Sequence, residues 1–100
     1  MSFQAVEIKT ATVGATPLSL ASTLFNFATT NLTGAQKVVI SPTSASLRIS
    51  SATTAPSTSL GIAVTSGTNY EVVGTANVAN LYMTRATTSA DANVVAEIYK

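Results

Sequence analysis

Short apolar runs rich in β-branched residues recur along this chain, and clusters of glycine, proline, asparagine and serine separate them. Ten valines and seventeen threonines supply most of the β-branched side chains, which fit a pleated, half-buried surface. Runs of this kind, spaced by roughly 8–12 residues, are typical of sandwiches and barrels. The pattern therefore predicts an all-β protein, a single small β-sandwich or jelly-roll-like barrel of about seven short strands.

The expected strands follow from alternation and from the residues that break it. Val6, Ile8 and Thr10 alternate with other residues, which predicts a half-buried strand that ends at residues 14–17. Residues 18–33 are ambiguous: Leu20, Leu24 and Phe27 have helical spacing, whereas Phe25 and Phe27 alternate as in a strand. We expect an irregular, partly helical crossover there. We expect further strands at 35–41, 45–51, 60–64, 70–73, 81–85 and 93–99, with a tight turn at 66–69 and a 3₁₀ turn at 78–80. The expected core positions in these strands are Val39, Ile49, Val72 and Ile98.

The whole chain, residues 1–100, is expected to form one domain, because a hundred residues allow one modest core. No linker, repeat or shift in composition marks a boundary. Residues 1–34 are expected to supply a strand and the irregular crossover, and residues 35–100 the main strand-rich part.

The charge content excludes several classes of function. Charged residues make up 9% of the chain, against about 25% in ordinary soluble domains. Five basic and four acidic residues form no basic stripe, so we expect no nucleic-acid partner. The absence of cysteine and histidine removes thiolate ligands, the commonest metal ligand and the commonest general base. We expect no metal and no cofactor.

No apolar stretch is long enough to span a bilayer, so no membrane partner is expected. The first residues carry neither a basic segment nor an apolar one of the kind found in signal peptides. We therefore expect a protein that is made in the cytoplasm and is not secreted.

The acidic residues offer little for catalysis. Glu71 and Glu97 lie on expected strands and could form the carboxylate pair of a glycosidase, but the alternative, solvent-facing charges, is favoured. Asp91 and Asn93 fall far short of the six to eight oxygen ligands that calcium takes. The serines and threonines have no histidine to activate them. We expect no enzyme and assign no catalytic residue.

Serine and threonine supply 29 of the 100 residues, and such side chains lose little entropy when a contact orders them. This nearly uncharged surface suits wide contacts with other protein subunits; the alternative is a surface kept soluble by its hydroxyls. The candidate contact residues are Phe3, Leu24, Phe25 and Phe27, for which no place in the core is evident. Their alternative role is a core plug that closes one end of the sandwich.

Several segments appear in the order found in one family of viral proteins: KVVIS at 37–41, ASLRIS at 45–50, LGIAV at 60–64, SGTNYEV at 66–72, NLYMTR at 80–85 and VVAEIY at 94–99. With them, the last two-thirds of the chain resembles the small all-β structural proteins of tailed bacteriophage virions, particularly head decoration and head-fibre-base domains. The resemblance concerns strands and turns, and it transfers no functional residue.

The resemblance implies a virion subunit, most simply a decoration or cement protein that binds and stabilises a bacteriophage head. Its partner would be the major capsid protein or another virion protein, and it would form a symmetric homo-oligomer, with a trimer favoured. A tail, baseplate or head-fibre component is an alternative. A further alternative is a carbohydrate- or receptor-binding module that stacks sugars on Tyr70, Tyr82 and Tyr99.

Overall fold

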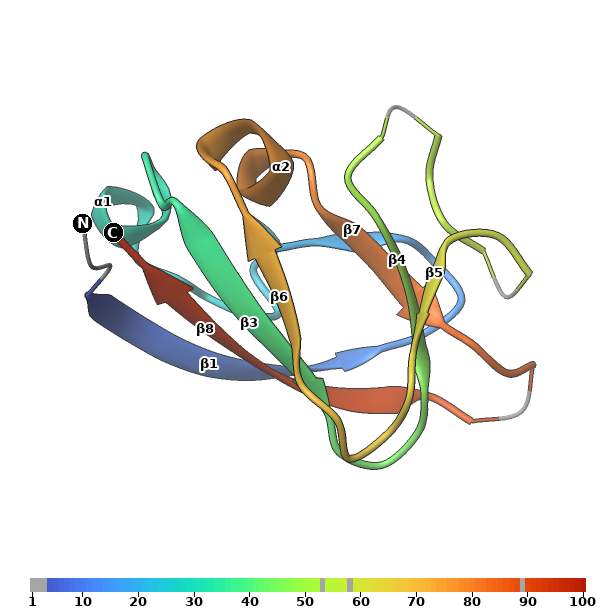
Figure 1. The fold of residues 1–100 in the computed structure, drawn as a ribbon. Coiled ribbons are helices and arrows are strands. Elements are labelled where there is room, and N and C mark those ends of the chain that lie inside the picture. The colour runs from blue at the N-terminus through green and yellow to red at the C-terminus, as the bar shows by residue number, and fades with distance from the viewer. Residues whose placement is uncertain (1–3, 53, 58, 89) are drawn as a thin grey trace.

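The structure, a computed structural model, describes residues 4–52, 54–57, 59–88 and 90–100 (Figure 1). Within these residues, eight strands and two short helices follow one another. In order they are β1 (Ala5–Val13), β2 (Leu18–Ser19), α1 (Thr29–Leu32), β3 (Lys37–Pro42), β4 (Leu47–Ser50), β5 (Ile62–Val64), β6 (Tyr70–Val73), α2 (Thr75–Ala79), β7 (Tyr82–Arg85) and β8 (Ala92–Tyr99). The protein is all-β, as predicted.

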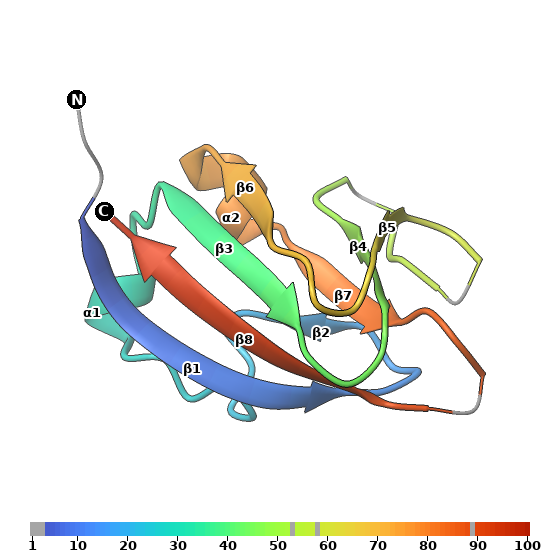
Figure 2. The same cartoon turned by 60° about the horizontal axis from the view of Figure 1, so that its bottom comes forward.

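The strands pair in a nested order. β4 pairs with β5, β3 with β6, β2 with β7 and β1 with β8, and every pair is antiparallel. Two further antiparallel pairings, β3 with β8 and β4 with β7, connect these pairs within each sheet. The result is two four-stranded sheets, which we call sheet A, with the order β1-β8-β3-β6, and sheet B, with the order β2-β7-β4-β5. Figure 2 shows the four strands of sheet A side by side.

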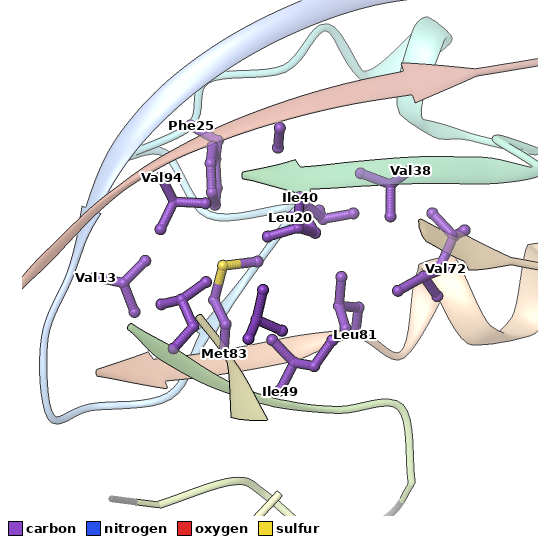
Figure 3. Close-up of a cluster of buried hydrophobic side chains, with 14 of the residues drawn as sticks. Val13, Leu20, Phe25, Val38, Ile40, Ile49, Val72, Leu81, Met83 and Val94 are labelled. Carbon is purple, nitrogen blue, oxygen red and sulfur yellow. The ribbon is translucent and has the colours of Figure 1, made fainter. Parts of the chain in front are cut away.

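One continuous cluster of buried side chains joins the two sheets. Figure 3 shows side chains of β3 and β8, such as Ile40 and Val94, on one side of this cluster and Met83 of β7 on the other. Residues between the strands, including Leu20, Phe25 and Leu81, complete it. Both sheets therefore bury one face in the same apolar core, which removes a large apolar area from water.

Three of the four predicted core positions are confirmed and one is wrong. Ile49, Val72 and Ile98 are buried, whereas Val39 is only half-buried. Successive side chains of a strand point to opposite faces, and in β3 it is Val38 and Ile40 that point into the core. Val39 lies between them on the outward face.

The predicted face of the first strand is also wrong in part. Ile8, expected to be half-buried, is 56% exposed, and Thr10 is exposed as well. A register shift between Ala5 and Glu7 in the pairing of β1 with β8 inserts one extra residue. Such a bulge changes which face the following side chains occupy, so Ala11 and Val13 reach the core instead.

Eight strands are present where about seven were expected, because two residues of the crossover, Leu18 and Ser19, pair with β7. The rest of the crossover is irregular apart from α1, as predicted. The 3₁₀ turn expected at 78–80 is instead the end of the five-residue helix α2. The turn at 66–69 is present, and it leads from β5 in sheet B to β6 in sheet A.

Candidate contact surfaces

The crossover places its three candidate contact residues in different environments. Leu24 is 62% exposed, whereas Phe25 is 1% exposed and belongs to the core. Phe27 is half-buried and packs against the core, with its ring stacked on that of Phe25 at a centroid distance of 5.6 Å. Phe3 lies outside the described residues. The core-plug alternative therefore applies to Phe25. Of the three candidates that the structure describes, Leu24 is the one open to a partner.

The local backbone explains this division. The backbone N–H groups of Phe25 and Asn26 both donate to the carbonyl of Ser22, which closes a tight turn. Asn26 follows with φ at 59°, a left-handed conformation that asparagine tolerates better than most residues. Around this turn Phe25 points inward while Leu24 remains outside.

A hydrogen-bonded carboxylate fastens the end of the crossover to β1. Glu7 accepts a hydrogen bond from the backbone N–H of Ala28 at 3.0 Å and one from Asn31 Nδ2 at 3.1 Å. Lys9 lies 3.6 Å from the second carboxylate oxygen. The hydrogen bond from Asn31, followed by the smaller effects of Ala28 and Lys9, holds the pKa of Glu7 below its ordinary value against the opposing effect of desolvation.

A second exposed surface lies between the edges of the two sheets. A groove of about 260 Å³, which we call the β5–β6 groove, is lined by residues including Ile49, Ile62, Tyr70, Glu71, Val72 and Val73. β5 and β6 stand at the ends of their sheets. Where the two strands approach the connecting turn, Val64 is buried. At the far end Ile62, paired in register with the buried Ile49, is 52% exposed and lines the groove.

The outward face of sheet A carries a chain of polar contacts. Glu71 and Glu97 are the partners of Val39 on its two sides, so the structure does place these two residues on one face. Their backbones lie two strand spacings apart, about 9–10 Å. Both carboxylates are engaged. Lys37 Nζ lies 3.4 Å from Glu71, and Glu97 accepts a hydrogen bond from the hydroxyl of Tyr99.

Lys37 and Tyr99 complete this chain. Lys37 Nζ also lies 4.7 Å from the centroid of the Tyr99 ring, a geometry in which the ring face attracts the cation. The hydrogen bond to Glu97, with desolvation as a smaller cause, raises the pKa of Tyr99 above its ordinary value. The arrangement anchors charges on the sheet and does not present two free carboxylates to a substrate.

The other residues weighed for chemistry are separated or engaged. Asp91 pairs with Arg85 at 2.6 Å, and the side-chain oxygen of Asn93 accepts a hydrogen bond from Thr12. Within the described ranges, no group of three or more acidic, histidine or cysteine side chains is placed to hold a metal ion. Over the same residues, no helix is long and apolar enough to cross a membrane.

The three tyrosines do not form one platform. Tyr99 projects from the outward face of sheet A, where it neighbours Lys37. Tyr82 lies on β7 in sheet B and is exposed, and Tyr70 lines the β5–β6 groove.

Sequence reasoning missed the β5–β6 groove. Its apolar residues were assigned to strands, but the pattern of a strand does not say whether the strand stands at the edge of a sheet. Comparison of the chain with known protein families, with curated proteins and with solved structures found no match.

Proposed function

We propose that the two sheets form a jelly-roll β-sandwich. The nested pairing is the observation that supports this. A long hairpin of four antiparallel pairs, rolled so that β8 joins β3 and β7 joins β4, has the sheet orders 1-8-3-6 and 2-7-4-5. An eight-stranded jelly roll, built from two Greek keys, has this order. The shared core between the sheets fits the same architecture.

We further propose that the protein is a non-enzymatic structural subunit of a bacteriophage particle, and specifically a decoration protein that stabilises the head. Jelly rolls are a recurrent fold of viral capsid proteins. Fold alone does not define function, so the proposal rests also on the resemblance of residues 37–99 to phage structural proteins and on the nearly uncharged surface. A tail, baseplate or head-fibre subunit is the nearest alternative.

The ionic contacts support a partner that is recognised by shape. Lys9 pairs with Glu7, Lys37 with Glu71 and Arg85 with Asp91, so three of the four acidic residues are neutralised within the chain. Such a surface gives little electrostatic steering. We propose that it binds the major capsid protein or another virion protein through apolar area and hydroxyl groups, with Leu24 among the contacts, and as a symmetric homo-oligomer.

Attachment to capsids tests the proposal directly. Purified protein is mixed with bacteriophage heads that lack a decoration protein, and occupancy is measured by sedimentation from low salt to about 1 M, where the Debye length falls to about 3 Å. Occupancy that hardly changes with salt supports the proposal. Wholesale release at high salt would show attachment through exposed charges, and no binding to heads or tails would overturn the virion assignment.

A carbohydrate-binding module is the second candidate, because lectins also use jelly rolls. Tyr82 and Tyr99 lie on strands of different sheets, and this weighs against one stacking platform made by the three tyrosines. A glycan array decides between the two, since a subunit that acts through assembly binds no sugar.

A further inference from the structure

The hydrogen-bond pattern of β3 determines which backbone groups of β6 are free. In an antiparallel ladder, successive residues turn their N–H and C=O groups alternately toward the two neighbouring strands. The backbone N–H of Thr43 donates to the carbonyl of Asn93 at 2.8 Å and continues the register of β3 with β8. Odd-numbered residues of β3 therefore bond to β8, and the even-numbered Val38 and Ile40 bond to β6.

On β6, the partners of these two residues are Val72 and Tyr70. Glu71 and Val73 therefore direct their backbone N–H and C=O groups away from β3, at the edge where the β5–β6 groove lies. The side chain of Val73 is also 50% exposed there. The carbonyl of Val73 accepts a hydrogen bond from Asn77 Nδ2 at 3.0 Å, so this edge offers another strand the N–H and C=O of Glu71 and the N–H of Val73. An edge strand with such outward-directed backbone groups is a template for another extended strand.

The charges on and beside β6 favour pairing with β6 of a second copy of the chain, in one particular register. Like charges directly opposite each other destabilise a pair of strands, which excludes Glu71 facing Glu71. With Glu71 opposite Val73 of the partner subunit, the N–H of each Val73 faces the C=O of the opposite Glu71. The N–H of Glu71 faces the Val73 carbonyl, whose second lone pair is free to accept it beside the hydrogen bond from Asn77. Val73 is the register partner of Lys37, which lies 3.4 Å from Glu71 within one chain. Each Glu71 would then lie between its own lysine and Lys37 of the partner subunit.

We infer that a second copy of this chain covers the β5–β6 groove, with β6 pairing antiparallel to β6 of the partner subunit across a two-fold axis. Such an axis runs perpendicular to the sheets, so it continues sheet A and also brings the two β5 edges toward each other. The exposed side chain of Ile62 is then buried, and the contact is self-complementary. This dimer goes beyond the proposed function, and a trimer on a particle would need another surface.

The association of the purified protein tests the inference without any other component. Sedimentation equilibrium over a range of protein concentrations should show a monomer–dimer equilibrium. Hydrogen exchange, followed residue by residue by NMR, should show the amides of Glu71 and Val73 becoming slower as the dimer forms, because β3 does not protect them. A monomer at every concentration overturns the inference, and so does a dimer in which these two amides exchange as fast as in the monomer.

Charge variants test the register. Glu71→Lys should raise the dimer dissociation constant by about tenfold, because the contact occurs twice and each exposed ion pair contributes about 0.7 kcal/mol. The double variant Lys37→Glu/Glu71→Lys should restore dimerisation. Thr10→Lys, on the exposed face of β1 at the other edge of sheet A, is the matched control and should leave it unchanged.

Thermal unfolding at low concentration separates loss of the fold from loss of the dimer. A folded Glu71→Lys variant that dimerises like the parent overturns the register, and dissociation by Thr10→Lys instead moves the contact to β1. If Glu71→Lys fails to fold, the exchange of the wild-type amides still decides the inference.

Discussion

Glu7 on β1 and Asn31 on α1 are joined by a hydrogen bond of 3.1 Å, with the amide of Asn31 donating to the carboxylate. The same carboxylate oxygen accepts the backbone N–H of Ala28. Through this one group, the bulged first strand holds the end of a crossover that has little regular structure of its own. The crossover also carries Phe25 into the core, so this contact helps to position a core residue.

The first prediction concerns pH. Because the pKa of Glu7 is lowered in the folded protein, its contribution to stability is present above the unfolded pKa and is lost as pH falls through the folded pKa. Asn31→Ala removes the largest cause of the shift, so the folded pKa should return toward its ordinary value and the loss of stability on acidification should become smaller. An NMR titration of the Glu7 carboxyl group, with thermal unfolding at neutral and acidic pH, measures both effects. A Glu7 carboxyl that titrates at its ordinary pKa in the parent protein would contradict the prediction.

The second prediction separates the two neighbours Leu24 and Phe25. Phe25→Ala should cost about 3–5 kcal/mol of unfolding free energy, because it empties a buried site. Leu24→Ser should change that free energy by no more than about 0.5 kcal/mol, since the side chain is largely exposed. On heads that bind the parent protein, Leu24→Ser should lower occupancy. Urea unfolding and the sedimentation assay supply the two readouts, and equal occupancy would remove Leu24 from the proposed contact.

The third prediction concerns the faces of the central strands. Truncation of Ile49 or Ile98 to alanine should cost about 2–5 kcal/mol, because both side chains are fully buried. Val39→Ala is the control on the outward face of β3, and its cost should be well below that range. Chemical denaturation with an unchanged m value makes the comparison. A cost at Val39 equal to that at Ile98 would mean that the two faces of sheet A are equally buried.

The fourth prediction compares two glycines with positive φ. Gly67, at φ 85°, has open space where a Cβ would stand, so Gly67→Val should cost roughly 1 kcal/mol or more from conformation alone, and Gly67→Asn should cost less. A Cβ on Gly61, at φ 120°, would lie 2.8 Å from the carbonyl oxygen of Ile49. Gly61→Ala should therefore be more costly than Gly67→Ala. Thermal unfolding of the four variants tests this order, and the reverse order for the two alanine variants would contradict it.

The sequence pattern predicted which side chains point into the core where a strand has a neighbour on each side and its apolar residues alternate plainly with polar ones. Leu47 and Ile49 of β4 alternate with polar residues, and both are buried. The run from Val38 to Ile40 has no alternation, so only its partners in the sheet decide which side chains face the core. In β1 the alternation was clear but misleading, because the bulge after Ala5 depends on pairing with β8, far away in the sequence.

The candidate contact surfaces were less predictable, for a related reason. Exposure of Ile62 and Val73 follows from the position of β5 and β6 at the sheet edges, and strand order is a property of the whole fold. Leu24 and Phe25 have equally apolar side chains, and the turn at Ser22 alone assigns one to the surface and the other to the interior. The sequence predicted a crossover with apolar residues but not which of them would remain accessible.

The nested order of strand pairs also bears on how the chain folds. The innermost pair, β4 with β5, closes the shortest loop, and each pair that forms brings the strands of the next pair together. Closing loops in this order avoids paying the full entropy of joining distant segments at once. As the chain is synthesised, every strand of sheet B emerges before β8 does. Sheet B can thus assemble before sheet A is complete, because β8, which lies between β1 and β3, is synthesised last.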